Sequence, residues 1–385
     1  MRKIEVKKDI YWVGTIDWNL RHFHGYLTQK GTTYNAYLII DEKITLVDTT
    51  KGWMADEMLK RISAIIDPSK IDYIVANHVE MDHSGGLPKM MEIAPNAKIV
   101  TCEKGRVGLE RHFKKNWAYH IVKSGDVLNL GKRNLNFVLT PMVHWPDNMV
   151  AYMPEEKILF SNDGLGQHIA TIERFDDEYA LGTIIDEAKK YYANIVLPYG
   201  IQVNAELKAA STLDIEMICP SHGIIWRSHV KEIIAKYQEW ASNKTKKKVV
   251  IVYDTMWNST SKMADAIAEG FDDKEYEVKK CFLQSEHISD IMTDVIDAEY
   301  ICLGTPILNR SILPNMAAFV TYLKGLEPKG RKYFVFGSYG WAPAGIDELA
   351  ESIKKLGEVK GIYKMNYIPD ETELVELKAK IKELI

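Results

Sequence analysis

The pattern of apolar residues changes once along this chain, after a polar and charged stretch at residues 241–248. Before it, short runs rich in Val, Ile and Tyr alternate with turn residues, which is typical of strands in mixed or antiparallel sheets. After it, Val249–Tyr253 is apolar throughout, as expected for a strand buried on both faces of a parallel sheet. A chain of 385 residues also exceeds one ordinary domain. We therefore expect two domains, residues 1–243 and 249–385, joined by a solvated linker that contains Lys244 and Lys246–Lys248.

The first domain is expected to be a layered α/β structure. Its strand-like runs are joined by short turns, and helical periodicity appears between some of them. Two packed sheets with helices on them would accommodate both patterns. The expected strands include 34–40, 44–48, 73–76, 98–101 and 135–139, and the expected helices include 56–66, 176–192 and 231–240.

The second domain alternates strand and helix throughout. Buried strands are expected at 249–253, 300–304 and 333–336, and helices at 261–270, 314–324 and 371–385. This alternation, over about 135 residues, predicts a doubly wound parallel sheet of the flavodoxin-like type.

Charge and cysteine usage exclude several classes of protein. The net charge of −4 argues against nucleic acid as the main partner, because phosphate binding requires a basic face. No run of about 20 apolar residues is present, so no membrane span is expected. The four cysteines form no Cys-x-x-Cys pair, and each adjoins apolar residues, so we expect buried free thiols in a reducing cytoplasm.

The segment with the clearest chemistry runs from His78 through Glu80 and Asp82 to His83. Four potential metal ligands lie within six residues and directly follow an apolar run, so they occupy the loop that leaves a strand. We expect Gly85 and Gly86 to permit the sharp turn that brings the side chains together. A polar surface turn is the alternative, but ligand residues this dense favour a metal site.

Three further candidates lie downstream, each after a strand-like run and before Gly or Pro: His144, Asp163 and His222. Such positions are where a scaffold places functional side chains. Singly, each has a structural alternative, a capping aspartate or a hydrogen-bonded histidine. Together they supply the side chains that a second metal ion needs.

The loop after Tyr253 resembles the phosphate loop of flavodoxins. Its hydroxyl groups and the backbone N–H groups at the start of the next helix suit a phosphate. A helix cap made by Ser259 or Thr260 is the alternative. Two more loops, 304–309 and 337–341, also follow buried strands, where doubly wound sheets bind their ligands, so we predict an FMN site. The candidate residues are Thr255, Met256, Trp257, Asn258, Ser259, Thr260, Thr305, Pro306, Ile307, Asn309, Ser338, Tyr339, Gly340 and Trp341.

His-x-Glu-x-Asp-His followed by a distant His, Asp and His resembles the metallo-β-lactamase-like fold, an αββα sandwich. Zinc hydrolases of that fold carry a histidine where this chain has Glu80. Together with a flavodoxin-like domain, this substitution resembles the flavodiiron proteins, or A-type flavoproteins, over essentially the whole chain. The resemblance implies two iron ions, with Asp163 bridging them. One iron would be held by His78, Glu80 and His144, and the other by Asp82, His83 and His222, although the histidine at the position of His83 is not a ligand in every member.

The resemblance also implies an activity. The expected reaction is reduction of dioxygen to water, of nitric oxide to nitrous oxide, or both, with electrons passing from FMN to the irons. It implies a head-to-tail homodimer, or a homotetramer built from two, and an external donor similar to rubredoxin. His24 lies where the family has a histidine near the metals that is not a ligand, and the alternative is a structural histidine among aromatic residues.

Two other functions remain open from the sequence. One is a metallo-β-lactamase-fold hydrolase with a flavodoxin-like regulatory module. The other is an electron carrier or redox sensor without enzymatic activity. The ligand set is common to reductases of both gases, so the sequence leaves the preferred gas open as well.

Overall fold

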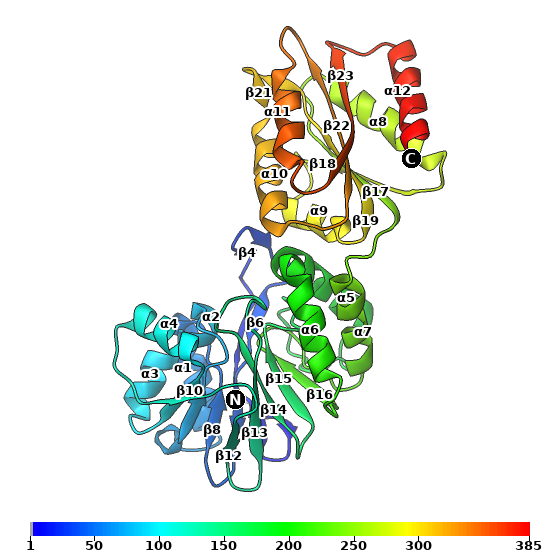
Figure 1. The fold of residues 1–385 in the computed structure, drawn as a ribbon. Coiled ribbons are helices and arrows are strands. Elements are labelled where there is room, and N and C mark those ends of the chain that lie inside the picture. The colour runs from blue at the N-terminus through cyan, green and yellow to red at the C-terminus, as the bar shows by residue number, and fades with distance from the viewer. Residues whose placement is uncertain (1–2) are drawn as a thin grey trace. The chain divides into compact units, whose positions relative to one another are not determined.

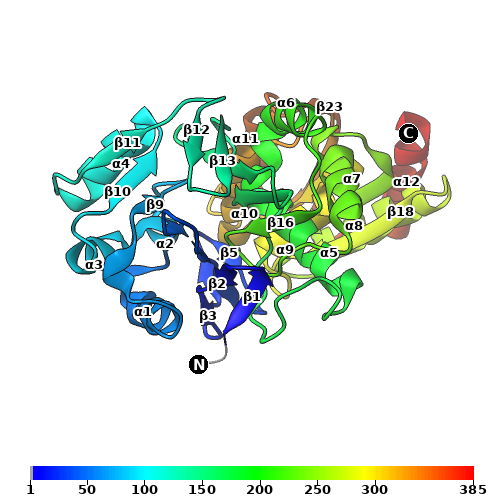
Figure 2. The ribbon, with the colours of Figure 1, turned by 90° about the horizontal axis from the view of Figure 1, so that it is seen from below.

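The computed structural model describes residues 3–385, which form two compact units (Figures 1 and 2). The N-terminal unit comprises most of the chain up to Gln238. The C-terminal unit comprises the chain from Glu239 onward and two short segments, Gly25–Leu27 and Tyr192–Gly200.

The N-terminal unit contains two mixed sheets, as the sequence predicts. In the larger sheet the first four strands in spatial order pair antiparallel and the fourth to the last pair parallel. In the smaller sheet only the last pair of strands is parallel. In spatial order the larger sheet consists of β1 (Ile4–Lys7), β2 (Ile10–Trp12), β7 (Tyr37–Ile39), β8 (Thr45–Val47), β9 (Tyr73–Val75), β10 (Lys98–Thr101) and β11 (Tyr119–Ile121). The smaller sheet consists of β12 (Val127–Asn129), β13 (Asn134–Leu139), β14 (Met149–Met153), β15 (Ile158–Asn162) and β16 (Met217–Pro220).

The two sheets pack face to face. Val75 of the larger sheet and Phe137 and Phe160 of the smaller one belong to a single buried cluster. The neighbour of Val75, Ile74, points to the opposite face, because side chains alternate along a strand. There it joins a second cluster with residues of α1 (Ala55–Ser63), α3 (Leu87–Ile93) and α4 (Glu103–Phe113). On the outer side of the smaller sheet lie α5 (Leu181–Tyr191), α6 (Gly200–Ala210) and α7 (Val230–Ala241) (Figure 1). The αββα sandwich is confirmed.

The C-terminal unit is built on one parallel sheet. Its strands, in spatial order, are β18 (Glu277–Phe282), β17 (Lys246–Tyr253), β19 (Ala298–Gly304), β22 (Lys332–Tyr339) and β23 (Glu358–Asn366). The helices are α8 (Ser259–Asp272), α9 (Ile288–Val295), α10 (Pro314–Leu326), α11 (Ala344–Ile353) and α12 (Glu371–Leu384). One face is covered by α8 and α12, whose Ile267 and Ile381 pack into the cluster around Ile251 and Phe334. The other helices lie on the opposite side (Figure 1). The flavodoxin-like doubly wound sheet is confirmed.

The prediction of a solvated lysine linker is wrong at its second half. Strand β17 begins at Lys246, and Lys248 is only 4% exposed. Its ammonium group lies 3.0 Å from a carboxylate oxygen of Asp294 and 3.4 Å from one of Asp297. Carboxylates distant in sequence therefore neutralise a charge that appears unpaired within its own segment.

Two other elements differ from expectation because a polar side chain bonds elsewhere. The expected strand 34–40 is divided into β6 (Thr32–Tyr34) and β7, since the Asn35 amide group donates to the carbonyl oxygens of Pro220 and Gly223. The expected helix 176–192 starts only at Leu181. Asp176 instead accepts backbone N–H groups at the start of α7.

Two expectations about composition agree with the structure. All four cysteines are buried, and none forms a disulfide. Within residues 3–385, no helix combines the length and the apolar character that crossing a bilayer requires.

Candidate metal and cofactor sites

The seven candidate metal ligands converge at one end of the N-terminal unit. Asp163 directly follows β15, His222 lies just beyond β16, and His78 lies just beyond β9. These strands belong to different sheets of the sandwich, so the loops at their ends meet over the core. Asp82 and His83 lie in α2 (Met81–Ser84), a single helical turn rather than a loop.

The expected sharp turn at Gly85 and Gly86 is wrong. Both residues have ordinary helical backbone angles, with φ of −60° and −81°. Gly85 is required for close approach instead. A side-chain carbon there would lie 2.4 Å from the Met81 carbonyl oxygen and 2.6 Å from the Gly52 nitrogen. The one-turn helix α2 can therefore lie directly against the segment at Gly52.

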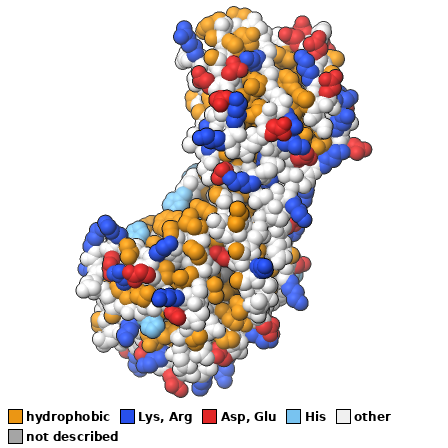
Figure 3. Space-filling model, viewed as in Figure 1, with side chains coloured by type: hydrophobic (Ala, Val, Ile, Leu, Met, Phe, Trp, Pro, Cys, Tyr) orange, Lys and Arg blue, Asp and Glu red, His pale blue; other side chains and the backbone are white. Residues whose placement is uncertain are grey.

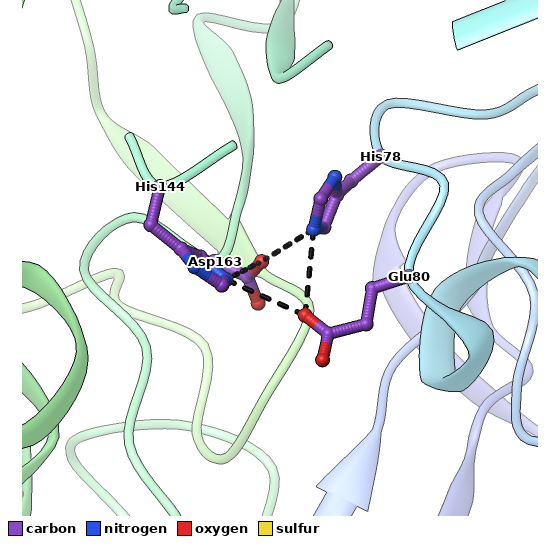
Figure 4. Close-up of side chains that lie close together, drawn as sticks. All are labelled: His78, Glu80, His144 and Asp163. Carbon is purple, nitrogen blue, oxygen red and sulfur yellow. Dashed lines mark ion pairs between the residues drawn. The ribbon is translucent and has the colours of Figure 1, made fainter. Parts of the chain in front are cut away.

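The ligand atoms fall into two groups, and within each they lie within 4.8 Å of one another. In the first group, the Nε2 atoms of His78 and His144 each lie 3.4 Å from one Glu80 oxygen (Figure 4). In the second, Asp82 carboxylate oxygens lie 3.2 Å from His222 Nε2 and 3.4 Å from His83 Nε2. The groups are His78, Glu80, His144 and Asp163, and Asp82, His83 and His222.

Asp163 faces both groups. Its Oδ2 lies 3.5 Å from His144 Nε2 and 3.9 Å from His78 Nε2. Its Oδ1 lies 3.0 Å from His83 Nε2 and 3.4 Å from His222 Nε2. One carboxylate thus turns one oxygen toward each group, which is the arrangement of a carboxylate that bridges two metal ions.

Many atoms at the centre of the cluster are buried and make no hydrogen bond within the described chain. They are His78 Nε2, both carboxylate oxygens of Asp82, both ring nitrogens of His83 and Asp163 Oδ2. Burying polar atoms without partners is unfavourable, by about 1–3 kcal/mol each. Imidazole nitrogens and carboxylate oxygens are ligands for divalent transition metals, so a metal pair fits these residues.

Charge in the cluster is strongly coupled. Burial opposes protonation of the imidazoles, but hydrogen bonds to Asp147 and Glu80 raise the pKa of His78 to about 10. Asp163 and Glu80 raise the pKa of His144 to about 9, and Asp163 and Asp82 raise that of His222 to about 10. The imidazoles in turn hold the pKa of Glu80 well below its usual value, despite its burial. Without metal, three of these imidazoles are therefore protonated at neutral pH.

His24 reaches this cluster from an exposed position. Its side chain is 71% exposed, yet Nε2 lies 2.7 Å from Glu80 Oε1. The hydrogen bond to Glu80 raises the pKa of His24. The Phe23 ring lies beside it, with ring centroids 4.3 Å apart.

Several residues that support the candidate ligands escaped the sequence analysis. Asp147 lies 2.9 Å from His78 Nδ1, the Thr33 carbonyl oxygen lies 2.8 Å from His222 Nδ1, and the Tyr191 hydroxyl donates to Asp163 at 3.0 Å. Asp48 is buried at the end of β8 and accepts hydrogen bonds from Asn77. The criterion of a polar residue directly after an apolar strand, applied to every strand, would have identified Asp48.

The expected phosphate loop lies at the edge of the C-terminal unit where β17, β19 and β22 end side by side. Helix α8 starts at Ser259 after Asn258, which has a left-handed backbone, and no side chain caps its first turn. The alternative of a cap made by Ser259 or Thr260 is therefore wrong. Thr255 Oγ1 is buried and has no hydrogen-bond partner among residues 3–385. Uncapped N–H groups beside a hydroxyl group without a partner fit the phosphate of a mononucleotide.

The other two expected loops border the first. Thr260 and Ser338 hydroxyl oxygens lie 3.4 Å apart. Ser338 and Tyr339 belong to the end of β22 rather than to a loop, and Ile307 lies in β20 (Ile307–Leu308) of a short hairpin with β21 (Ser311–Ile312).

The remaining expected flavin residues lie around this edge. Asn309 lies in the turn between β20 and β21 with φ of 51°. Thr305 and Pro306 precede β20, and Met256, Gly340 and Trp341 lie between regular elements. Two large aromatic side chains project outward here, since Trp257 is 82% and Trp341 83% exposed. Aromatic faces of this kind can flank a flat ring system.

Comparison with known proteins matches both units. The ODP family beta lactamase model matches residues 32–223, and the flavodoxin model matches residues 251–380. The chain is 44% identical to the rubredoxin-oxygen oxidoreductase of Megalodesulfovibrio gigas, over 93% of this chain and 90% of that protein. It is 43% identical to a nitric oxide reductase of Moorella thermoacetica, over 91% of this chain and 89% of that protein. Among solved structures, the flavodiiron protein from Giardia intestinalis superposes with a TM-score of 0.96 at 34% identity, over 100% of this chain and 96% of that one.

Proposed function

Because this chain belongs to the flavodiiron protein family, we propose that it is an oxidoreductase that reduces dioxygen to water, nitric oxide to nitrous oxide, or both. The observation that carries the proposal is the position of Asp163, whose two oxygens face two separate groups of ligand side chains. A flavodoxin domain in the same chain provides a reason for a redox-active metal there. The names of the two relatives support both gases as substrates.

We assign the two metal positions residue by residue. His78, Glu80 and His144 would hold one iron, Asp82, His83 and His222 the other, and Asp163 would bridge them. Two bound iron ions would supply the site where the gas binds and the electrons that reduce it. Each position has one carboxylate of its own besides the shared one, and this hard, negative ligand set suits a metal that cycles between +2 and +3. Zinc has no redox role, so a flavin domain would serve it no purpose.

Other residues of the chain would orient the bridging carboxylate and deliver protons to the metal cluster. The Tyr191 hydroxyl donates to Asp163 Oδ1 and so fixes the rotation of the bridging carboxylate. His24 holds a proton on Nε2 beside Glu80, on the exposed side of the cluster. Reduction of either gas consumes protons, and a partly exposed imidazole at this place can carry them from solvent.

FMN would bind where β17, β19 and β22 end. The first turn of α8 and the Thr255 hydroxyl would hold its phosphate, and the segments around Thr305 and Ser338 would border its ring. Bound FMN would supply electrons one at a time.

We further propose a small external electron donor similar to rubredoxin and a head-to-tail homodimer, alone or paired into a tetramer. The name of the Megalodesulfovibrio gigas relative supports the donor. Exposed apolar side chains lie near each cofactor site in its own unit. Trp53 and Met81 are 79% and 46% exposed near the metal cluster, and Trp257 and Trp341 project near the flavin loops. Figure 3 shows apolar side chains beside histidines on one face of the N-terminal unit. Exposed Trp and Met are typical of protein interfaces.

The activity is tested by reducing the iron-loaded protein without oxygen and titrating it separately with dioxygen and nitric oxide. We expect the reduced flavin to be reoxidised rapidly by at least one gas. In the Asp163→Asn variant the flavin should still be reduced, but gas consumption should fall by at least about 10²-fold, since the shared ligand loses its charge. A protein that contains a zinc pair and hydrolyses esters, or a reduced protein that consumes neither gas, would contradict the proposal.

The dimer is tested by mixing two inactive variants. Asp163→Asn disables the metal pair but leaves the flavin, whereas Gly337→Ala is designed to prevent flavin binding but leaves the metals. If FMN of one chain reduces the metals of the other, the mixed dimer contains one working pair and regains activity. If each chain reduces its own metals, mixing restores nothing.

A further inference from the structure

The two metal positions differ in the group that lies next to Nδ1 of their histidines, the ring nitrogen that points away from the cluster. His78 Nδ1 lies 2.9 Å from a carboxylate oxygen of Asp147, whereas His222 Nδ1 lies 2.8 Å from the backbone carbonyl oxygen of Thr33. His83 Nδ1 makes no hydrogen bond in the described chain. At one metal position a negatively charged carboxylate therefore accepts a hydrogen bond from a ligand imidazole. At the other position a neutral backbone carbonyl group does so.

Hydrogen bonds hold Asp147 in a fixed position. It is 5% exposed, and the same Oδ2 atom that faces His78 also accepts the Val79 backbone N–H at 2.8 Å. Its own carbonyl oxygen accepts the Cys102 thiol at 3.2 Å. Rotation of the carboxylate would break both contacts of Oδ2, so the geometry is fixed from two sides.

The contact determines which nitrogen of His78 carries the proton. An ionised carboxylate can only accept, so Nδ1 must donate to Asp147. In the neutral imidazole that would bind a metal, Nε2 is then the nitrogen with the free electron pair, and it is the one that faces Glu80 and Asp163. A carboxylate behind a ligand imidazole also makes the ligand more basic.

Asp147 also joins the two histidines of the same position. It lies three residues after His144, and between them Trp145 N–H bonds to the Asn148 side chain. The Asn148 amide group donates to Asn162, the residue before Asp163. The carboxylate thus holds the His78 segment against the turn that carries His144.

We propose that Asp147 is a positioning residue that makes the metal at the His78, Glu80 and His144 position the one with the lower reduction potential of the pair. The inference rests on the proposed di-iron function. Each position has one carboxylate of its own and shares Asp163, so the charges of the ligands themselves are balanced. The extra negative charge of Asp147 then favours the +3 state at its own position. Another buried carboxylate, Asp48, interacts electrostatically with His83 of the second position. It accepts hydrogen bonds from Asn77 and Ser221 rather than from a ligand ring, and burial raises its pKa, so it supports a ligand less directly than Asp147 does.

The test replaces the charge and keeps the shape. In Asp147→Asn, an amide oxygen can still accept from His78 and Val79, so geometry is kept while the charge is lost. The control is Asp176→Asn, the same change at a buried carboxylate that accepts backbone N–H groups at α7 and contacts no ligand ring. The potentials of the two irons are measured by redox titration, followed by the electron paramagnetic resonance signal of the half-reduced pair.

We expect Asp147→Asn to raise the lower of the two potentials and to narrow the range in which the half-reduced pair exists. Each tenfold preferential loss of ferric affinity corresponds to about 59 mV. The control should change neither potential. Two unchanged potentials in an Asp147→Asn protein with normal iron content would overturn the proposal.

A second measurement applies if Asp147→Asn retains too little iron for the redox titration. Stepwise binding of cobalt(II) to the metal-free protein reports each position separately through its absorption spectrum. Loss of a carboxylate behind a ligand histidine weakens metal binding by about 10–100-fold. We expect that loss in one of the two steps only, and equal weakening of both steps would contradict the inference. Neither measurement requires gas reduction, so the result does not depend on which gas is the substrate.

Discussion

His24 Nε2 and Glu80 Oε1 lie 2.7 Å apart, so a largely exposed imidazole contacts a carboxylate of the buried metal cluster. His144, a candidate ligand that contacts the same carboxylate, is by contrast only 15% exposed. The contact gives His24 access to both solvent and the metal pair, as expected of a residue that relays protons.

Replacement of His24 by alanine should slow gas reduction by about tenfold while iron content stays unchanged, because water replaces an exposed proton donor only in part. The hydrogen bond to Glu80 raises the pKa of His24, so its proton is held to higher pH than in a free imidazole. The activity it supports should therefore fall as pH rises through that raised pKa. Turnover measured against pH checks this, with His112→Ala, at an exposed histidine of α4, as the control. An unchanged pH profile would argue for a structural histidine.

Iron loading should release protons. In the metal-free protein the pKa values of His78 and His222 are raised to about 10 and that of His144 to about 9, so all three are charged at pH 7. A metal binds only the neutral imidazole. Calorimetric titration in buffers of different ionisation enthalpy should therefore show the release of up to three protons as the metals bind. Loading without any proton release would contradict these shifted pKa values.

The same groups determine how the metal-free protein responds to pH. Their folded-state pKa values lie above the unfolded value of about 6.5. The stability they contribute is thus complete below pH 6.5 and is lost as pH rises through 9–10. Denaturant unfolding should show this loss for metal-free protein, and the dependence should be absent from the loaded protein, whose ligand imidazoles are neutral throughout.

The convergence of the candidate ligands could be predicted from sequence because four of them lie within six residues and the other three each follow a strand-like run before Gly or Pro. Their supports could not. Asp147 contacts His78, 69 positions earlier in the chain, and Thr33 contacts His222 through its backbone. A single sequence does not show which backbone carbonyl oxygen will accept a hydrogen bond, or which residues far apart in the chain will be in contact. The expected strand 98–101 coincides with β10, whereas the continuously apolar run 249–253 is only the second part of β17.

Two strands that the sequence analysis did not identify have a weak apolar pattern. Strand β18 lies at an edge of its sheet and carries Lys279 and Lys280, and β23 at the other edge alternates half-buried and exposed side chains. Edge strands bury little surface, so their sequences resemble polar loops. The start of β17 was missed for a related reason, since Lys248 is buried by partners that only the fold supplies.

Gly337→Ala should abolish flavin binding. A side-chain carbon at Gly337 would lie 2.0 Å from the Thr305 carbonyl oxygen, so the segments at the ends of β19 and β22 would be forced apart. Gly325→Ala in α10 is the matched control, because a side chain there meets nothing within 4 Å. Flavin absorbance after purification and reconstitution separates the two. Full flavin content in Gly337→Ala would remove these segments from the proposed site.

Gly223→Ala should weaken one metal position while leaving the flavin bound. Gly223 follows His222 with φ of 79°, and a side-chain carbon there would lie 2.3 Å from the carbonyl oxygen of buried Gln167. Gln167 also bonds the next residue, Ile224, through its side chain, so the His222 segment cannot shift without breaking those contacts. We expect iron content to fall from about two toward one per chain, with affinity at the His222 position reduced by about 10–100-fold.

The control variant Gly125→Ala separates crowding from backbone strain, because Gly125 has φ of 90° but open space around it. That variant should lose only about 1 kcal/mol of stability and keep both irons. Equal loss of iron in the two variants would show that backbone strain, rather than displacement of His222, empties the site.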